Sequence, residues 1–331
     1  MKPEHKPPVV GLALGSGSAR GWSHIGIILE LEALGVRPQV IAGTSVGALV
    51  GGVYVAGQLR EFADWVCKLT VRDVFGLMDL TLTGGFVKGE RLFGFFNEHH
   101  RNPNIEELEQ RFVSVATEMQ SGREIWITSG PVWAAARASC AMPGLFTPVK
   151  HEDRWMLDGG LVNPVPVSAC RALGADVVIA VNLNAQLVGS HMSSASRAEA
   201  QREADAEEKQ GGDGKNRSFW NKVVNYLQSS NSDTPSFFDS VASSVNIMQD
   251  RLTRSRMAGD PPEITLIPRL DDFALMDFHR AGEAIEEGRR LVRAHESEIR
   301  AWTGVPAGTD ARTVQERQLE VLAAEGDEPD A

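Results

Sequence analysis

The chain has 331 residues, enough for one large domain or a domain with appendages. Its 44 acidic residues outnumber its 33 lysines and arginines, and the net charge of −11 argues against a nucleic-acid partner. Three cysteines are too few for a disulfide framework or a Cys-rich metal site. No apolar run reaches the ~18–20 residues of a membrane span, so we expect a cytoplasmic protein that contacts the inner membrane at most peripherally.

The first predicted element is a buried strand over residues 9–14 that runs into a loop of small residues, Gly15 to Gly21. A helix follows the loop, and its start leaves backbone N–H groups unpaired. Such groups suit a phosphate or the oxyanion of an acyl-transfer intermediate. The loop ends in Ala19-Arg20-Gly21, whereas a P-loop requires Gly-Lys-Ser/Thr and a dinucleotide site requires a third glycine at Arg20. An oxyanion hole and a plain tight turn therefore remain as the two interpretations.

The second predicted unit carries a serine between two glycines. Residues 40–42 form a short apolar strand, Gly43-Thr44-Ser45-Val46-Gly47 follows, and residues 48–56 are helical. This is the context of a nucleophile elbow, in which a sharp turn presents a serine at the end of a strand. We expect Gly43 and Gly47 where a Cβ would clash with a neighbouring strand or helix. Ser45 is the predicted nucleophile.

A third motif places a carboxylate at a strand end. The apolar residues 155–157 lead into Asp158-Gly159-Gly160. A serine hydroxyl needs a base to take its proton, and an acid beside two glycines can approach a nucleophile closely. An ordinary Asp-Gly turn is the alternative interpretation of this tripeptide in isolation.

The rest of the chain alternates predicted strands and helices, which favours an α/β fold with a mostly parallel sheet. Residues 112–118 and 124–128 form a strand pair, 176–183 a buried strand, 263–267 a last strand, and 273–302 a long helix or helix pair. Apolar residues between 60 and 100 either fill the core or line an acyl pocket. The composition divides the chain into five parts: a flexible N-terminus at 1–8, a catalytic core at 9–185, a disordered insertion at 186–218, a helical and strand remainder of the catalytic domain at 219–302, and an acidic flexible tail at 303–331. The remainder begins with an amphipathic patch at 219–227.

Taken together, the loop at 15–21, the elbow at 43–47 and the Asp-Gly-Gly at 158–160 resemble the patatin-like phospholipase family. Residues 84–92 and 137–146 are similar to small bacterial members of its neuropathy-target-esterase-like branch. Ser16 and Ser18 stand where many members have glycine, a change that leaves the backbone donors in place.

The resemblance implies a three-layer α/β/α fold and a lipid acyl hydrolase for phospholipids or lysophospholipids that needs no metal or cofactor. It implies a Ser-Asp dyad and an acyl-serine intermediate. The residues implied for the site are the dyad Ser45 and Asp158; the oxyanion donors Gly17, Ser18 and Ala19; Arg20 and Gly15, which position the loop; and the elbow and turn glycines Gly43, Gly47, Gly159 and Gly160.

Two other functions compete with this interpretation. An α/β-hydrolase with a Ser-Asp-His order would draw its base from His191, His279 or His295, none of which lies in the loop context that such a base requires. A scaffold with a catalytically weak dyad could instead bind lipid as a regulatory protein. His24, three residues after Gly21, is expected to orient the glycine loop or to pack within its helix.

Overall fold

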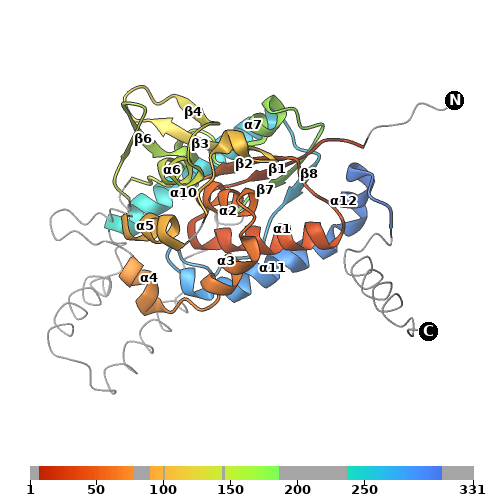
Figure 1. Cartoon of the computed structure of the whole chain (residues 1–331), viewed down its shortest axis with the longest axis horizontal. Coiled ribbons are helices and arrows are strands. Elements are labelled where there is room, and N and C mark those ends of the chain that lie inside the picture. The colour runs from red at the N-terminus through yellow and green to blue at the C-terminus, as the bar shows by residue number, and fades with distance from the viewer. Residues whose placement is uncertain (1–6, 78–89, 100, 144–145, 186–236, 308–331) are drawn as a thin grey trace, which may run out of the picture.

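The computed structural model describes residues 7–77, 90–99, 101–143, 146–185 and 237–307 (Figure 1). Its strands are β1 (Val10–Leu14), β2 (Val40–Thr44), β3 (Arg111–Glu118), β4 (Glu124–Ile127), β5 (Val149–His151), β6 (Arg154–Asp158), β7 (Val177–Val181) and β8 (Ile264–Leu266). Its α-helices are α1 (Ser23–Ala33), α2 (Val46–Val55), α3 (Leu59–Val66), α4 (Val71–Leu77), α5 (Glu90–His99), α6 (Val132–Ser139), α7 (Val167–Ala172), α10 (Phe237–Gly259), α11 (Ala281–Ala294) and α12 (Glu296–Thr303). Short 3-10 helices are η1 (Ser18–Trp22), η2 (Ile105–Glu107), η3 (Gly159–Leu161) and η4 (Phe278–Arg280).

The described strands form one sheet, connected in the order β5-β6-β3-β2-β1-β7-β8, with β4 paired to β3. The pairs β3–β2, β2–β1, β1–β7 and β7–β8 are parallel, whereas β4, β5 and β6 join by antiparallel pairs. Every residue of β1, β2 and β7 is buried, as expected for central strands covered on both faces. The mostly parallel α/β sheet predicted from the sequence is confirmed.

One edge of β3 carries two strands end to end. Strand β2 pairs with β3 residues 111–115, and β6 pairs with residues 116–118. Strand β4 pairs with residues 114–117 and therefore overlaps both, so it must occupy the opposite edge of β3. Thr44 is consequently opposite Val115 while Asp158 is opposite the next residue, Ala116, which brings the C-terminal ends of β2 and β6 together.

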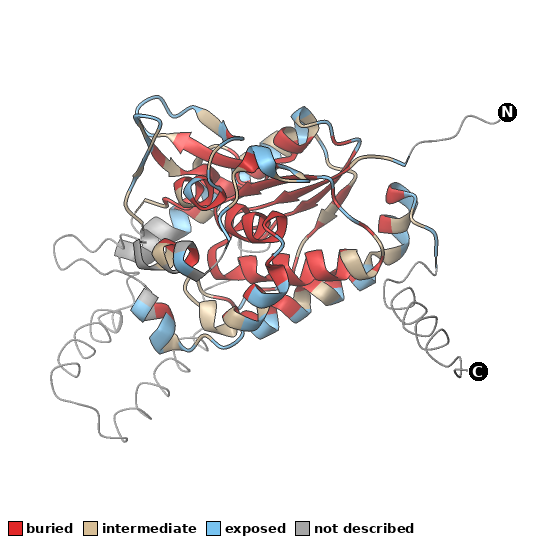
Figure 2. Cartoon of the chain, viewed as in Figure 1, coloured by how far each residue is buried: buried red, intermediate tan, exposed pale blue. Residues whose placement is uncertain are grey.

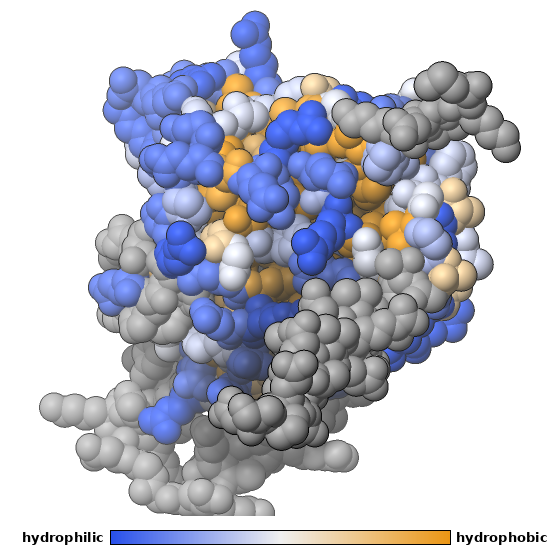
Figure 3. Space-filling model, turned by 45° about the vertical axis from the view of Figure 1, so that its right-hand side comes forward, coloured by the Kyte–Doolittle hydropathy of each residue, from blue (hydrophilic) through white to orange (hydrophobic). Residues whose placement is uncertain are grey.

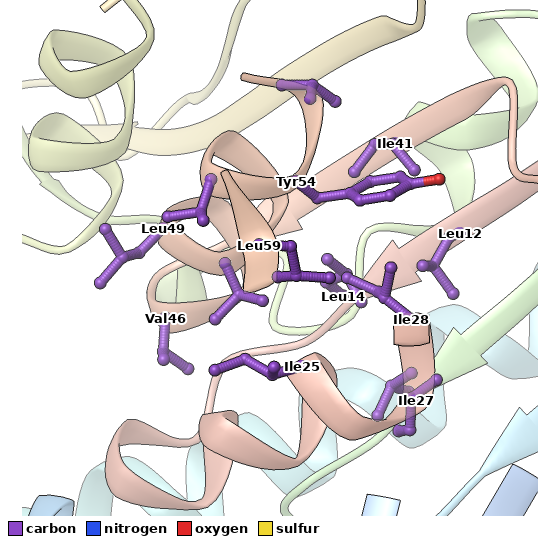
Figure 4. Packing of buried hydrophobic residues seen from close by; sticks show 14 of the residues in the cluster. Leu12, Leu14, Ile25, Ile27, Ile28, Ile41, Val46, Leu49, Tyr54 and Leu59 are labelled. Carbon is purple, nitrogen blue, oxygen red and sulfur yellow. The ribbon is translucent and has the colours of Figure 1, made fainter. Parts of the chain in front are cut away.

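Alternate residues of the central strands enter two separate hydrophobic clusters, because side chains along a strand point to opposite faces. On β1, Leu12 and Leu14 join one cluster and Ala13 joins the other. The first cluster is covered by α1, α2, α3, α6 and α11, and Figure 4 shows its packing between the sheet and the first three helices. The second is covered by α7 and by Met257 of α10. Helices therefore cover both faces, and Figure 2 shows the buried sheet between them.

The helical predictions differ from the structure in two places. The helix after the glycine loop begins with a 3-10 segment, η1, and becomes α-helical only at Ser23. Of the long helix or helix pair predicted over 273–302, the pair is present as α11 and α12, but residues 273–277 before η4 are not helical. The predicted insertion at 186–218, the amphipathic patch at 219–227, most of the motif at 84–92 and nearly all of both termini lie outside the described residues.

Within the described part of the chain, no helix combines the length and the hydropathy needed to cross a bilayer. The face in Figure 3 is mixed, with hydrophobic residues showing between hydrophilic ones. Among the residues that the structure describes, the large apolar side chains that are exposed are Met119, Trp126, Trp155, Ile247, Met248 and Trp302.

Helices α1 and α11 pack closely because each presents a glycine to the other (Figure 1). A Cβ built on Gly26 would lie 1.8 Å from the Ile285 carbonyl oxygen, and one on Gly288 would lie 2.2 Å from the Ser23 carbonyl oxygen. Glu30 beside this crossing accepts two hydrogen bonds from the Arg293 guanidinium. The backbone contact fixes α11 against the helix that follows the glycine loop.

We predict that Gly26→Ala lowers the free energy of unfolding by about 1–3 kcal/mol, because the new Cβ meets backbone that cannot move cheaply. Gly282→Ala on α11 is the matched control, since a Cβ there has no atom within 4 Å. This control should be neutral or slightly stabilising. Guanidinium denaturation measures both, and equal costs at the two glycines would contradict the packing described.

Candidate active site

Ser45 lies in the turn between β2 and α2 with φ 57° and ψ −124°, a conformation that non-glycine residues rarely adopt. Its backbone N–H donates to Ser139 Oγ at 2.8 Å, and its Oγ donates to Asp158 Oδ2 at 2.6 Å. The Ser139 hydroxyl in turn donates to the Val115 carbonyl. The strained turn is thus held from α6 and β3, and the contact between Ser45 and Asp158 predicted from the sequence is present.

The elbow glycines allow strand and helix to meet closely. A Cβ on Gly43 would lie 2.5 Å from Ala48 Cα, and one on Gly47 would lie 2.1 Å from the Leu14 carbonyl oxygen. Neither neighbour could yield, because both are backbone. A Cβ on Gly159 would lie 2.1 Å from the Val115 carbonyl oxygen, so the turn after Asp158 depends on the same absence of a side chain.

Asp158 ends β6 and is 1% exposed. Its Oδ1 accepts a hydrogen bond from the Gly160 N–H at 2.7 Å, which leaves Oδ2 directed at Ser45. Burial raises the pKa of this carboxyl to about 6, and the hydrogen bonds from Ser45 and Gly160 oppose that rise by stabilising the ionised form. The ionisation of this carboxyl therefore falls close to neutral pH.

The glycine loop offers two of the three predicted oxyanion donors. The N–H groups of Gly17 and Ser18 have no hydrogen-bond partner among the described residues. The Ala19 N–H instead donates to the Leu275 carbonyl oxygen at 3.3 Å, a partner 256 residues further along the chain that the sequence could not reveal. Gly15 is fixed against β7, since its N–H donates to the Val181 carbonyl oxygen at 3.1 Å.

Arg20 and His24 are two buried side chains that form hydrogen bonds at this loop. Arg20 is 3% exposed, its Nη2 donates to Asn184 Oδ1 at 3.2 Å, and burial lowers its pKa to about 10. No carboxylate of a described residue pairs with it, which fits a positioning role. His24 Nε2 lies 2.8 Å from the Gly15 carbonyl oxygen, and burial lowers the pKa of the ring to about 4. The neutral ring therefore donates to Gly15, a contact that favours the first of the two roles expected for His24, orienting the glycine loop.

A pocket of about 790 Å³, counting open solvent at its mouth, leads to Ser45. The apolar side chains that line it come from η1, α2, α3, the turn between α3 and α4, α4, α5, η4 and the segment after α6: Trp22, Val46, Leu49, Trp65, Leu69, Val74, Leu92, Phe93, Met142, Phe146 and Phe278. Ser18 and Cys140 also reach it. The apolar residues between 60 and 100 thus divide, with Phe62 and Phe96 in the core and others in the pocket wall.

Motif analysis missed three polar side chains that hold the site: Ser139, Gln249 and Asn184. Ser139 lies in the segment at 137–146 that is similar to small bacterial members of the family, so the sequence did contain a signal for it. Gln249 lies 233 residues from its partner Ser16 and has no local signal.

Of the histidines considered for the rival triad, the two that the structure describes, His279 and His295, form no hydrogen bond with Ser45. His279 is half-buried in η4, and His295 Nδ1 lies 2.9 Å from the Leu291 carbonyl oxygen at the end of α11. His191 lies outside the described residues. Among the residues that the structure describes, no group of three His, Cys, Asp or Glu side chains is placed to hold a metal ion.

Comparison with known proteins agrees with this geometry. Residues 12–171 match the family model of patatin-like phospholipase, a span that contains the glycine loop, Ser45 and Asp158. Just under half of the chain is therefore similar to patatin-like phospholipases.

Its relatives are bacterial and fungal. An NTE family protein of Mycobacterium bovis is 40% identical over 183 residues, covering 55% of this chain and 51% of the relative. A lysophospholipase of Coccidioides immitis is 26% identical over 306 residues, covering 90% of this chain and 18% of the relative. The chain thus spans about half the length of the mycobacterial relative and less of the fungal one. The crystal structure of VipD from Legionella pneumophila aligns with a TM-score of 0.44 at 12% identity, over 98% of this chain and 82% of that one.

We predict that Asp158→Asn stabilises the fold at neutral pH by on the order of 2 kcal/mol. The folded-state pKa of Asp158 lies above its unfolded value, so the native state holds the extra proton between about pH 4 and 6 and loses this stability as the pH rises through 6. The asparagine has no charge to bury. Denaturation at pH 4 and pH 7 should show the advantage only at pH 7, and an equal difference at both would contradict the raised pKa.

Proposed function

We propose that the protein is a serine esterase that hydrolyses acyl esters of phospholipids or lysophospholipids, with Ser45 as nucleophile and Asp158 as its base. The proposal rests above all on the 2.6 Å hydrogen bond from Ser45 Oγ to a buried carboxylate at the inner end of an apolar pocket. A fungal relative named as a lysophospholipase aligns over 90% of the chain and supports the same class of substrate.

In the first half-reaction, Ser45 Oγ attacks the ester carbonyl carbon while its proton passes to Asp158 Oδ2. The carbonyl oxygen becomes an oxyanion, which the N–H groups of Gly17 and Ser18 stabilise as donors that need no reorganisation. Collapse of the tetrahedral intermediate breaks the bond to the alcohol oxygen. The leaving alcohol takes the proton back from Asp158, and the acyl group stays on Ser45.

Water completes the cycle by the same steps in reverse order. Asp158 takes a proton from the water as its oxygen attacks the acyl-serine carbonyl, and then returns that proton to Ser45 Oγ as the fatty acid leaves. Each proton that Asp158 accepts is given back within the same half-reaction. Arg20 and His24 hold the loop and take no part in proton transfer.

The lining of the pocket determines whether the acyl chain or the head group of the ester binds inside it. Its wall is almost wholly hydrocarbon and aromatic, so the acyl chain occupies it while the glycerol and head group remain outside. The ester must leave a bilayer or micelle to reach Ser45, so the proposal includes peripheral contact with a lipid surface. The catalytic domain in this proposal comprises residues 9–185 and 219–302, since β8 completes the sheet.

We predict that Ser45→Ala folds but loses hydrolysis of short-chain p-nitrophenyl esters by on the order of 10³-fold or more, because the nucleophile is removed. Ser121→Ala, at an exposed turn between β3 and β4, is the matched control and should keep full activity. Steady-state kinetics with purified protein decides it. Retention of more than a few per cent of turnover in the Ser45 variant would mean that another group attacks the ester.

The pH dependence follows from the raised pKa of Asp158. Only the ionised carboxylate accepts the serine proton, so kcat/KM should be level above about pH 6 and fall about tenfold per unit below it. An acid limb near pH 4, the ordinary range of an aspartate, would show that burial does not control the base. Rate profiles from pH 4 to 9 on a neutral ester give this limb directly.

The rival triad gives the opposite expectation for His279. We predict that His279→Ala keeps kcat/KM within about threefold of wild type and leaves the acid limb in place, because its ring does not hydrogen-bond to Ser45. Asp158→Ala, assayed in parallel, should remove nearly all activity. A loss of several orders of magnitude in the histidine variant would restore the triad.

A further inference from the structure

We infer that Gln249 of α10 is a positioning residue that sets the glycine loop relative to the turn carrying Asp158. This inference rests on the hydrolase function proposed above. Gln249 takes no part in the bond-making steps of that mechanism, and its helix lies on the opposite side of the sheet from the acyl pocket.

The Gln249 amide is fully enclosed at the junction of two site loops. Its side-chain Oε1 accepts hydrogen bonds from Ser16 Oγ and from Asn184 Nδ2, each at 2.9 Å. Gln249 is 2% exposed, and both partners are completely buried. Hydrogen bonds sealed from water in this way hold their geometry firmly, because breaking one leaves a buried group unpaired.

Ser16 is the residue on which the oxyanion donors depend. Its N–H donates to the Pro164 carbonyl oxygen at 2.8 Å and its hydroxyl donates to Gln249, so both its backbone and its side chain are held. Gly17 and Ser18, whose free N–H groups form the proposed oxyanion hole, follow directly. A shift of Ser16 therefore moves both donors.

The other end of the Gln249 amide faces the acid. A Cβ built on Gly160 would lie 2.4 Å from Gln249 Nε2 and 3.0 Å from Asp158 Oδ1, so the amide nitrogen packs against the turn whose N–H orients that carboxylate. This nitrogen is buried and has no hydrogen-bond partner among the described residues. An unpaired buried N–H destabilises the folded state, because it has lost its hydrogen bonds to water without gaining a partner. A group kept at such a cost beside the two catalytic loops fits a role in holding their spacing.

A second link from α10 reaches the nucleophile side. Arg256 forms a salt bridge with Glu124, and the Glu124 carboxylate accepts a hydrogen bond from Asn163 Nδ2. The Asn163 carbonyl oxygen accepts a hydrogen bond from the hydroxyl of Thr44, the residue before Ser45. Helix α10 thus contacts the oxyanion loop through Gln249 and the elbow through this chain. The shorter and more buried of the two links is the one through Gln249.

The test compares Gln249→Met, Ser16→Ala and the double variant with wild type. Methionine has nearly the shape of glutamine and no strong acceptor for Ser16. Ile247→Gln is the control, because Ile247 lies on the same helix and is 52% exposed. All proteins are assayed on p-nitrophenyl butyrate at a temperature where each is folded.

We expect Gln249→Met to lower kcat by roughly tenfold or more while KM changes less than about twofold, since misplacing a catalytic group by 1 Å costs up to ~10²-fold. The double variant should be no slower than the slower single variant, because both substitutions break the same hydrogen bond between Ser16 and Gln249. The control should match wild type. Unchanged kcat in Gln249→Met, or losses that multiply in the double variant, would overturn the inference.

Hydrogen exchange of the Ser16 and Ala19 amides, which donate to the Pro164 and Leu275 carbonyl oxygens, gives a readout that does not depend on turnover. In Gln249→Met these amides should exchange roughly tenfold faster than in wild type or in Ile247→Gln, because the loop is released locally. Unaltered exchange would overturn the positioning role. If wild type hydrolyses no ester, the proposed function fails, and faster exchange in Gln249→Met would still support the positioning of the loop.

Discussion

The candidate active site depends on how β2 and β6 share one edge of β3. Strand β3 pairs first with β2 and then, from the next residue on, with β6 running in the opposite direction. The C-terminal ends of β2 and β6 therefore meet; Asp158 is the last residue of β6, and Ser45 directly follows the last residue of β2. The 113 residues that separate the two in sequence have no bearing on their distance, because the register of β3 sets it. A slip of one residue would turn the Asp158 side chain to the other face of the sheet.

Glycines at this junction allow the strand ends to approach closely, and the resulting burial changes the pKa of Asp158. Gly43, Gly47 and Gly159 let backbone approach backbone to distances that a Cβ forbids, so the strand ends can close on each other. The same closeness excludes water from Asp158 and raises its pKa. A site assembled more loosely would leave the carboxylate solvated and a weaker base. The burial that makes the ionised Asp158 unfavourable in the folded state is thus the same burial that brings its pKa close to neutral pH.

Much of this architecture was readable from the sequence, because the central strands are apolar runs that end in glycine-bearing turns. These runs predicted β1, β2, β6 and β7 and placed Ser45 and Asp158 at strand ends. The shared edge of β3 was not readable, since pairing register depends on partners far away in the chain. The same holds for the Leu275 carbonyl that occupies the Ala19 N–H, and for Gln249. Local patterns identify which residues are special, and tertiary contacts decide which of their atoms are free.

The most direct measurement of the central claim is covalent labelling of the wild-type chain with a serine-directed fluorophosphonate, followed by intact mass and peptide mapping. The account predicts one adduct per chain, carried by Ser45 on the peptide that joins β2 to α2. Its rate should fall as Asp158 becomes protonated below about pH 6, because the serine then has no base. Absence of labelling, or an adduct on a different residue, would contradict the assignment of Ser45 and Asp158 as the reacting pair.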